Sequence, residues 1–524
     1  MIRFRTPLVA LALVIPVTLG PIRLAPAKGP ALVVVITVDQ LRPDYLSRWR
    51  EQWQGGFRSL LSDGAVFLEG RQDHALTETA PGHATVLSGR DPAHTGIVLN
   101  ELGVPDSAFP VLGDSSRVGA SPMRFKGTTL VDWMRKEDPA AAVLSLSGKD
   151  RGAILPIGRS RGSVFWYDRG RFTTSRYYAD SLPAWLTSWN ARRGAERLAG
   201  TTWAPLLPDS AYAEVDSEPY ENGGKDVAFP HHLPQDSSKI LSSLTDSPWL
   251  DSLTLDLALD GTRVLGLGRR EHADLLSLSL SATDYVGHTW GPDSREIHDH
   301  LLRLDRWLGT FFDSLSVLVP RERIVVVLTA DHGVTSYPEF LRAHNLPGGR
   351  VRLGAFVHDV NRVIGGRTGD STILHAAPGL IYGDTARLRS LGVSPESLAT
   401  NLAPRIWKLP GVVTAWTPAT LGGASVQDVH AVRWWRSLPS KFIWLVCGVA
   451  KPGYIWADST GSAAHGTSNS DDVDVPIIFL GSSFRAGMYP DTVPTTDIGP
   501  TLARLLHVKT EGRLDGKALK RILQ

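Results

Sequence analysis

A hydroxyl group that could act as a nucleophile lies in the segment 74–100, HALTETAPGHATVLSGRDPAHTGIVLN. The Pro-Gly pair at 81–82 interrupts any preceding element, and the following HATVLSG predicts a short helix that ends at Gly89. Thr79 is therefore expected in a turn at a helix entrance, where outward-pointing backbone N–H groups favour a phosphate or sulfate anion. A threonine in this position can also be a simple N-cap, so other residues must decide between the two interpretations.

Aspartate and histidine side chains follow or precede several predicted strands. They are Asp39 at the end of ALVVVITVD, Asp284 and His288 after DLLSLSLS, Asp331 and His332 after RIVVVLTA, and His465 in AAHGTSN before VDVPIIFLG. Singly, each could be a turn acid, a helix cap or a strand exit. Because α/β sheets bind ligands at the carboxyl ends of their strands, we expect these six side chains to converge on one rim.

Three aspartates and three histidines on one rim are typical of a metal site. Carboxylates and imidazoles without thiolates suit catalytic Zn²⁺. Six such ligands exceed the needs of one four-coordinate zinc and predict two zinc ions about 4 Å apart, the spacing used for in-line displacement at phosphorus. A threonine hydroxyl bound to such a metal would lose its proton without a histidine base, which favours the nucleophile interpretation of Thr79.

Further polar side chains could bind a phosphoryl group. Asn100 ends the nucleophile segment, and Lys149 and Arg151 follow the predicted strand AAAVLSLS. If strand geometry continues past residue 147, the two cations lie two residues apart on one face. Taken alone, Lys149-Asp150-Arg151 could equally be a solvated turn. A phosphate monoester carries two or three charged oxygens, so fixed cationic donors stabilise it more strongly than they stabilise a diester.

The elements that must position these residues form an alternating pattern. Uninterrupted apolar runs at 31–39, 140–147, 274–281, 323–330 and 473–481 predict buried strands, and 294–318 has a helical pattern. We therefore expect an α/β fold, with a mostly parallel central sheet flanked by helices. The stretches 152–255 and 340–460 fit this pattern poorly and are expected to be insertions over the rim of the site.

Composition narrows the class of protein. The 524 residues are 42% hydrophobic, and 55 basic against 53 acidic side chains leave a formal charge of +2, which gives no reason to expect a nucleic-acid partner. Basic residues and an apolar run before Ala25-Pro26-Ala27 predict a cleavable signal peptide over residues 1–27 and a periplasmic or secreted protein without a membrane span. Cys447, the only cysteine, is expected to be a buried core thiol.

The motifs together resemble the alkaline phosphatase superfamily. The matching segments are VVVITVDQLRPDYL, TETAPGHATVLSGR, SATDYVGHTWGPDSREIHDH, LTADHGV, AAHGTSNSDDVDVPIIFLG and TTDIGPTLARLL, which cover residues 28–524 nearly end to end. The chain is most similar to the threonine-nucleophile branch, which contains nucleotide pyrophosphatases/phosphodiesterases and secreted bacterial alkaline phosphatases of the phosphate-irrepressible type.

The resemblance implies roles for the residues named above. One zinc would be bound by Asp284, His288 and His465, and the other by Asp39, Asp331, His332 and the Thr79 oxygen. Asn100, Lys149 and Arg151 would bind the phosphoryl oxygens, and Thr79 would form a phosphothreonine intermediate. These four residues are the expected catalytic residues.

The expected function is hydrolysis of small-molecule phosphate monoesters with release of phosphate. A phosphodiesterase or nucleotide pyrophosphatase of the same superfamily is the main alternative. The resemblance implies that diesterases of this branch lack the Lys-x-Arg pair, which this chain carries as Lys149 and Arg151. A sulfatase fits less well, because sulfatases carry a Cys or Ser in a C/S-x-P-x-R motif and the one cysteine of this chain lies outside such a motif. A non-catalytic exported metal- or phosphate-binding protein would keep the ligands but show no turnover. The sequence does not indicate the oligomeric state, and a monomer is compatible with it.

Overall fold

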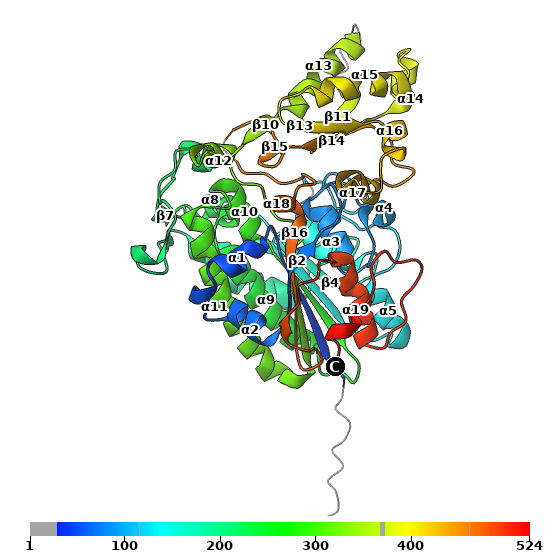
Figure 1. Ribbon diagram of the computed structural model, residues 1–524. Helices are drawn as coiled ribbons and strands as arrows, with labels where there is room; N and C mark the ends of the chain where they lie inside the picture. Colours follow the sequence, from blue (N-terminus) through cyan, green and yellow to red (C-terminus); the bar gives the residue numbers. More distant parts are fainter. Residues whose placement is uncertain (1–28, 115, 367–371, 461) are drawn as a thin grey trace, which may run out of the picture.

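The uninterrupted apolar runs of the sequence form the centre of the main sheet. The computed structural model describes residues 29–114, 116–366, 372–460 and 462–524 (Figure 1). In it, β1 (Leu32–Val38) lies between β8 (Asp274–Leu280) and β9 (Ile324–Thr329) and is parallel to both. All seven residues of β1 are buried. The prediction of a central parallel strand covered on both faces is confirmed.

The main sheet is mostly parallel, as expected. Its parallel block continues from β8 through β3 (Val143–Ser147) to β4 (Ser163–Asp168), and β5 (Arg171–Thr173) pairs antiparallel with β4 at one edge. On the other side of β9, the order is β16 (Asp474–Leu480) and then β2 (Ala65–Arg71), both antiparallel pairings, with β17 (Gly487–Met488) and β18 (Val493–Pro494) beside β2.

Helices cover both faces of this sheet because alternate residues of its strands point to opposite sides. Val34 and Ile36 pack in the cluster that includes α2 (Gly56–Asp63), α9 (Trp249–Leu265) and α11 (Arg295–Leu318). Val33 and Val35 face the cluster of α3 (Thr79–Val86), α5 (Leu130–Glu137) and α19 (Ile498–Leu505). The three-layer arrangement fixes the strand ends, where the predicted ligands lie.

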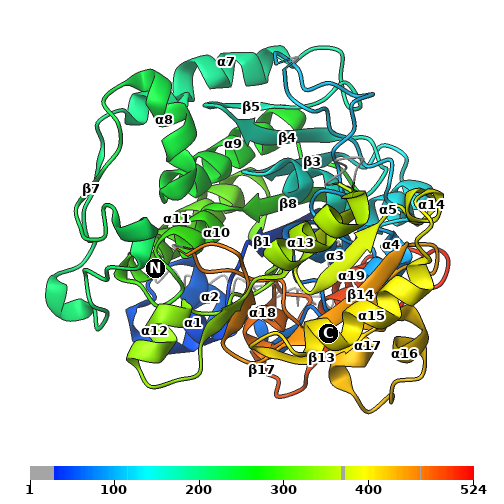
Figure 2. The ribbon, with the colours of Figure 1, turned by 90° about the horizontal axis from the view of Figure 1, so that it is seen from above.

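A second, smaller sheet lies above the carboxyl ends of the parallel strands (Figures 1 and 2). It has the antiparallel order β11 (Leu374–Ala377), β12 (Leu380–Gly383), β14 (Trp444–Ala450) and β13 (Val412–Trp416) and packs against α13 (Leu353–Gly365) and α15 (Pro395–Trp407). Its buried Cys447 shares an apolar cluster with Leu76 and Leu99 of the nucleophile segment. The second sheet therefore covers that segment directly.

The stretch 152–255 is not a single insertion. Its early part belongs to the main sheet, because β4 pairs in parallel with β3 and β5 returns beside β4. Along β4, Phe165 and Trp166 point into the cores on opposite faces of the sheet. A long irregular stretch, with β6 (Thr202–Trp203) and β7 (His231–His232) as its only strand pair among the described residues, follows α7 (Ala184–Arg193).

The remaining helices are short and lie around the sheets. They are α1 (Pro43–Arg48), α4 (Pro92–Thr95), α6 (Asp150–Ile154), α8 (Ser237–Ser243), α10 (Ala282–Thr289), α12 (Pro338–Ala343), α14 (Thr385–Ser390), α16 (Pro418–Gly422), α17 (Val429–Ser437) and α18 (Ser470–Val473), and β10 (Gly349–Val351) pairs with β15 (Tyr454–Trp456). Within the described ranges, no helix is both long and apolar enough to cross a membrane. The predicted signal peptide, residues 1–27, lies outside the described residues.

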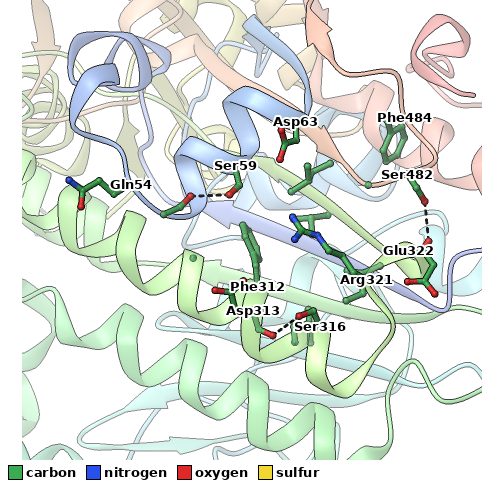
Figure 3. Close-up of a pocket in the computed structure, with 17 residues that line it drawn as sticks. Gln54, Ser59, Asp63, Phe312, Asp313, Ser316, Arg321, Glu322, Ser482 and Phe484 are labelled. Carbon is green, nitrogen blue, oxygen red and sulfur yellow. Dashed lines mark hydrogen bonds between the residues drawn. The ribbon is translucent and has the colours of Figure 1, made fainter.

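One cavity of the molecule, of about 590 Å³, lies beside the start of β9, away from the predicted site (Figure 3). It is lined by Ser59, Phe312 and Arg321, and by Ile324 at the start of β9. None of the predicted ligands lines it. The predicted ligands lie instead at the carboxyl ends of the parallel strands.

Candidate active site

The predicted acids come together at the carboxyl ends of three neighbouring strands, β9, β1 and β8. Asp39 directly follows β1, Asp331 lies two residues after β9, and Asp284 lies in the first turn of α10, which follows β8. Because these strands are adjacent and parallel, their exits meet at one edge. The three carboxylates are almost fully buried.

The histidines complete two adjoining groups of possible metal ligands. Ligand group 1 comprises Asp284, His288 and His465, and ligand group 2 comprises Asp39, Asp331 and His332. In group 2, one ligand atom from each residue lies within 4.8 Å of the others. In group 1, Asp284 Oδ1 lies 3.2 Å from His288 Nε2 and 3.7 Å from His465 Nε2. The rings of His332 and His465 stack at 3.7 Å, so the two groups adjoin.

Each of the three histidines is oriented by a backbone carbonyl. Their Nδ1 atoms lie 2.8 Å from Ala463 O for His288, 2.9 Å from Gly333 O for His332 and 2.7 Å from Thr77 O for His465. A carbonyl can only accept, so each Nδ1 carries a proton, and the neutral form of each ring has its lone pair on Nε2. Each ring is therefore oriented with Nε2 as the atom that can bind a metal ion.

Unpartnered polar atoms at the centre of the rim fit metal ligation. Asp39 Oδ1 and His332 Nε2 are buried and make no hydrogen bond. Burial, with the neighbouring carboxylates of Asp284 and Asp331, holds the pKa of Asp39 well above its ordinary value. A dication would stabilise buried acids that repel one another. The ligand atoms, carboxylate oxygen and imidazole nitrogen, are those that zinc binds.

Thr79 is the first residue of α3, and Glu78 is the residue that precedes the helix. The N-cap interpretation of Thr79 is therefore wrong. Helix α3 approaches the exit of β9 closely, because a Cβ at Gly82 would lie 2.1 Å from the carbonyl oxygen of Asp331. This glycine lets the helix bring the buried Thr79 to the carboxyl edge of the sheet, where ligand group 2 lies.

Asn100 is bound to the start of α3 by two hydrogen bonds. Its Oδ1 accepts from the N–H of Ala80 at 2.8 Å, and its own N–H donates to Glu78 Oε2 at 2.7 Å. Since Oδ1 is occupied, the Nδ2 amide is the group of Asn100 left to donate to a ligand. Sequence reasoning missed Glu78, whose partner lies 22 residues away.

Lys149 contacts both ligand groups. Its Nζ lies 2.6 Å from Asp39 Oδ2 and 2.5 Å from Asp284 Oδ2, and the residue is only 4% exposed. Although burial opposes it, the carboxylates of Asp284 and Asp39 raise the pKa of Lys149 above its ordinary value. The ammonium therefore remains charged at the junction of the two groups.

Arg151 is not on a strand, which corrects the expected geometry. β3 ends at Ser147, whose Oγ accepts the N–H of Lys149 at 2.9 Å, and α6 begins at Asp150. A Cβ at Gly148 would lie 2.7 Å from Leu250 Cδ2 and 2.8 Å from Ser281 Cβ, so the chain between β3 and α6 leaves no room for a side chain here. Arg151 lies in the first turn of α6, with a buried Nε that has no hydrogen-bond partner.

His83 is a further residue of the site that the sequence analysis did not select. Its Nδ1 lies 2.9 Å from the carbonyl oxygen of Thr79 and 3.1 Å from Asp331 Oδ2, and its Nε2 lies 2.9 Å from Ser279 Oγ. A residue four positions after Thr79 on a helix faces the same side, and this spacing could have identified it.

The chain is similar to several known proteins. The family model for type I phosphodiesterase / nucleotide pyrophosphatase matches residues 33–348. The chain is 31% identical to the alkaline phosphatase PhoV of Synechococcus elongatus, over 94% of this chain and 93% of that protein. It is 30% identical to the alkaline phosphatase PafA of Elizabethkingia meningoseptica, over 94% of each chain.

Solved structures agree with these sequence matches. The fold matches a crystal structure of wild-type alkaline phosphatase PafA with a TM-score of 0.87 and 29% identity, over 95% of this chain and 99% of that chain. Human ectonucleotide pyrophosphatase / phosphodiesterase 5, at 14% identity and a TM-score of 0.54, shares the fold.

Proposed function

Because this chain belongs to the type I phosphodiesterase/nucleotide pyrophosphatase family and is a phosphomonoester hydrolase of the alkaline phosphatase kind, we propose that it works through Thr79 and two zinc ions. The observation that carries the proposal is the junction of ligand groups 1 and 2, with histidines oriented by backbone carbonyls and a buried Asp39 Oδ1 that makes no hydrogen bond, where α3 begins with Thr79. Small-molecule phosphate monoesters are the proposed substrates.

The metal assignment follows the two groups. Asp284, His288 and His465 would hold one zinc ion, and Asp39, Asp331 and His332 would hold the other, with the Thr79 oxygen as its further ligand. Bound zinc supplies Lewis acidity, which lowers the pKa of a coordinated hydroxyl group and stabilises charge on a leaving oxygen. The absence of a thiolate among the ligands is typical of a catalytic site.

The chain's own residues then perform the transfer. Thr79 Oγ1 attacks phosphorus in line, the P–O bond to the alcohol breaks, and a phosphothreonine forms. Water attacks the same phosphorus in the second step, releasing phosphate and restoring the threonine. The Asn100 amide, Lys149 and Arg151 hold the equatorial oxygens as charge develops, and their orientation before reaction lowers the barrier.

The preference for monoesters is assigned to the two cations. Lys149 is anchored by two carboxylates, and the guanidinium of Arg151, whose side chain is 25% exposed, can donate to a phosphoryl oxygen. A diester carries less charge on those oxygens and gains less from the cations. The phosphodiesterase alternative therefore differs from our proposal in the contribution of these two side chains.

The test compares kcat/KM for an aryl phosphate monoester with that for a matched diester, on zinc-loaded protein and on the Lys149→Ala, Arg151→Ala double variant. We expect the monoester to lead by orders of magnitude and the double change to remove mainly that lead. A lead for the diester would move the assignment to the phosphodiesterase alternative. Absence of turnover on either ester would instead favour a binding protein.

Export is proposed from the N-terminal segment. The basic residues, apolar run and Ala25-Pro26-Ala27 pattern of residues 1–27 support a cleavable signal peptide and a periplasmic or secreted enzyme. Mass spectrometry of the protein from the periplasm and medium should find a chain that begins near residue 28. A full-length chain retained in the cytoplasm would contradict the proposal.

A further inference from the structure

A glutamine between the two ligand groups adopts a backbone conformation that side chains rarely take. Gln40 follows the ligand Asp39 directly and has a φ of +67°. It is 1% exposed. Such residues persist only where the surrounding structure holds them, and they concentrate at functional sites. The contacts of Gln40 therefore matter more than its position in the sequence suggests.

Gln40 contacts one aspartate from each ligand group. Its backbone N–H donates to Asp331 Oδ1 at 3.2 Å, and its side-chain Nε2 donates to Asp284 Oδ1 at 2.8 Å. The first contact depends on the backbone turn alone, whereas the second requires the amide side chain. The two groups thus depend on different parts of the same residue.

The helix that carries ligand group 1 is shaped to admit this side chain. Gly287 lies between Asp284 and His288 on α10, and a Cβ built on it would lie 1.9 Å from Gln40 Oε1. A larger residue at position 287 would displace the amide. The glycine therefore gives α10 the close approach that the hydrogen bond to Asp284 needs.

An amide suits this position better than a charged donor does. Lys149 already bonds to Asp284 Oδ2, and a second cation on Oδ1 would reduce the affinity of the carboxylate for a metal ion. The glutamine amide orients Oδ1 without adding charge. Hydrogen bonds of this kind to ligating side chains contribute strongly to metal affinity.

We propose that Gln40 is a positioning residue that orients Asp284 and so sets the zinc affinity of ligand group 1, while its backbone serves ligand group 2 whatever the side chain. The inference rests on the proposed two-zinc function. It predicts that substitution of Gln40 affects one zinc ion selectively.

The experiment measures zinc affinity by chelator competition in two backgrounds. Asp39→Ala retains ligand group 1, and His288→Ala retains ligand group 2. Gln40→Ala should weaken zinc binding about 10–100-fold in the first background and less than about threefold in the second. Equal weakening in both, or no weakening in the first, would overturn the proposal. If a background binds zinc too weakly to measure, the intact chain is titrated, and Gln40→Ala should weaken one of two binding steps.

Two further variants separate positioning from folding. Gln40→Gly removes the amide and should weaken zinc binding by ligand group 1 as Gln40→Ala does. Because glycine adopts the left-handed backbone without strain, the thermal midpoint of metal-free Gln40→Gly should be at least as high as that of metal-free Gln40→Ala. Gly287→Ala should weaken group 1 by displacing the amide, with no further loss when combined with Gln40→Ala. A lower thermal midpoint for Gln40→Gly than for Gln40→Ala, or additive losses, would contradict the proposal.

Failure of this inference is distinguishable from failure of the proposed function. If the unchanged chain binds fewer than two zinc ions, the two-zinc function is wrong. If it binds two and Gln40→Ala affects both alike, only the positioning role is wrong.

Discussion

The two groups of possible metal ligands and the residues proposed to bind the phosphoryl group, Asn100, Lys149 and Arg151, share one rim but are held by different means. Asp39 and Asp331 lie within two residues of the ends of buried parallel strands, and backbone carbonyls orient the three histidines of the ligand groups. Asn100 is instead held by the start of α3, and Lys149 by two ligand carboxylates. Ligand groups 1 and 2, the metal half of the site, are thus fixed by the sheet. The phosphoryl half, which comprises Asn100, Lys149 and Arg151, depends partly on the metal half.

This difference predicts that substrate binding can change without loss of metal, but not the reverse. Lys149 is the exception, because it contacts Asp39 and Asp284 directly. Changes at Thr79 or Asn100 should leave zinc content intact, and changes near Asp331 should affect zinc first. The following predictions, in order of decreasing effect, test that separation.

Replacement of the nucleophile should give the largest loss. Thr79→Ala removes the attacking oxygen, and we expect monoester kcat to fall by about 10⁴-fold or more, as for other nucleophile deletions. Because the six carboxylate and imidazole ligands remain, zinc content by mass spectrometry should stay near that of the unchanged chain. Thr79→Ser, which keeps a hydroxyl, is the matched control and should retain much more activity. Unchanged turnover of Thr79→Ala would refute the assignment.

Loss of the Asn100 amide should have a smaller effect, confined to the phosphoryl half. Asn100→Asp keeps an oxygen to accept from Ala80 but removes the Nδ2 donor. Loss of one such donor to a developing charge costs about 10²–10³-fold in kcat. Steady-state kinetics with mono- and diesters would measure this effect alongside zinc content. A parallel loss of zinc would show that the two halves are not separable here.

His83 should affect the metal half through Asp331. Its Nδ1 lies 3.1 Å from Asp331 Oδ2, so His83→Ala should lower the zinc affinity of ligand group 2 by about 10–100-fold. Chelator competition in the His288→Ala background measures this group alone. His83→Gln, which retains a donor, should recover part of the affinity. Unaltered affinity in both variants would exclude a positioning role.

Acid should weaken zinc binding through ligand group 1. Burial lowers the pKa of His288, but the Asp284 carboxylate outweighs it and raises that pKa above the ordinary 6.5. Without metal, His288 therefore holds a proton at pH values where a free histidine is neutral, and zinc must displace it. As pH falls through the raised pKa, affinity should drop by up to about tenfold per unit for this proton. Affinity that is independent of pH from 8 to 5 would contradict this.

Much of the fold and many candidate residues could be predicted from local sequence. The run ALVVVITV predicts a buried central strand, and the acids that follow such strands are expected at one edge because parallel strands end together. Both inferences need only hydrophobic pattern and strand polarity. The extent of the inserted regions was less accessible, because β4 joins the main sheet through a pairing with β3 that no local pattern specifies.

Contacts between distant segments lay beyond the sequence alone. Arg151 was expected on a strand, but β3 ends at Ser147 and α6 begins at Asp150, with Gly148 between them where Leu250 and Ser281 leave no room for a side chain. Nothing in the residue type of Gln40 predicts its left-handed conformation or its hydrogen bonds to two aspartates 244 and 291 positions away. The sequence thus defined which side chains could bind metal and phosphate, through strand ends and hydrophobic pattern. Tertiary packing determined their orientation, because hydrogen bonds between remote segments form only once the chain has folded.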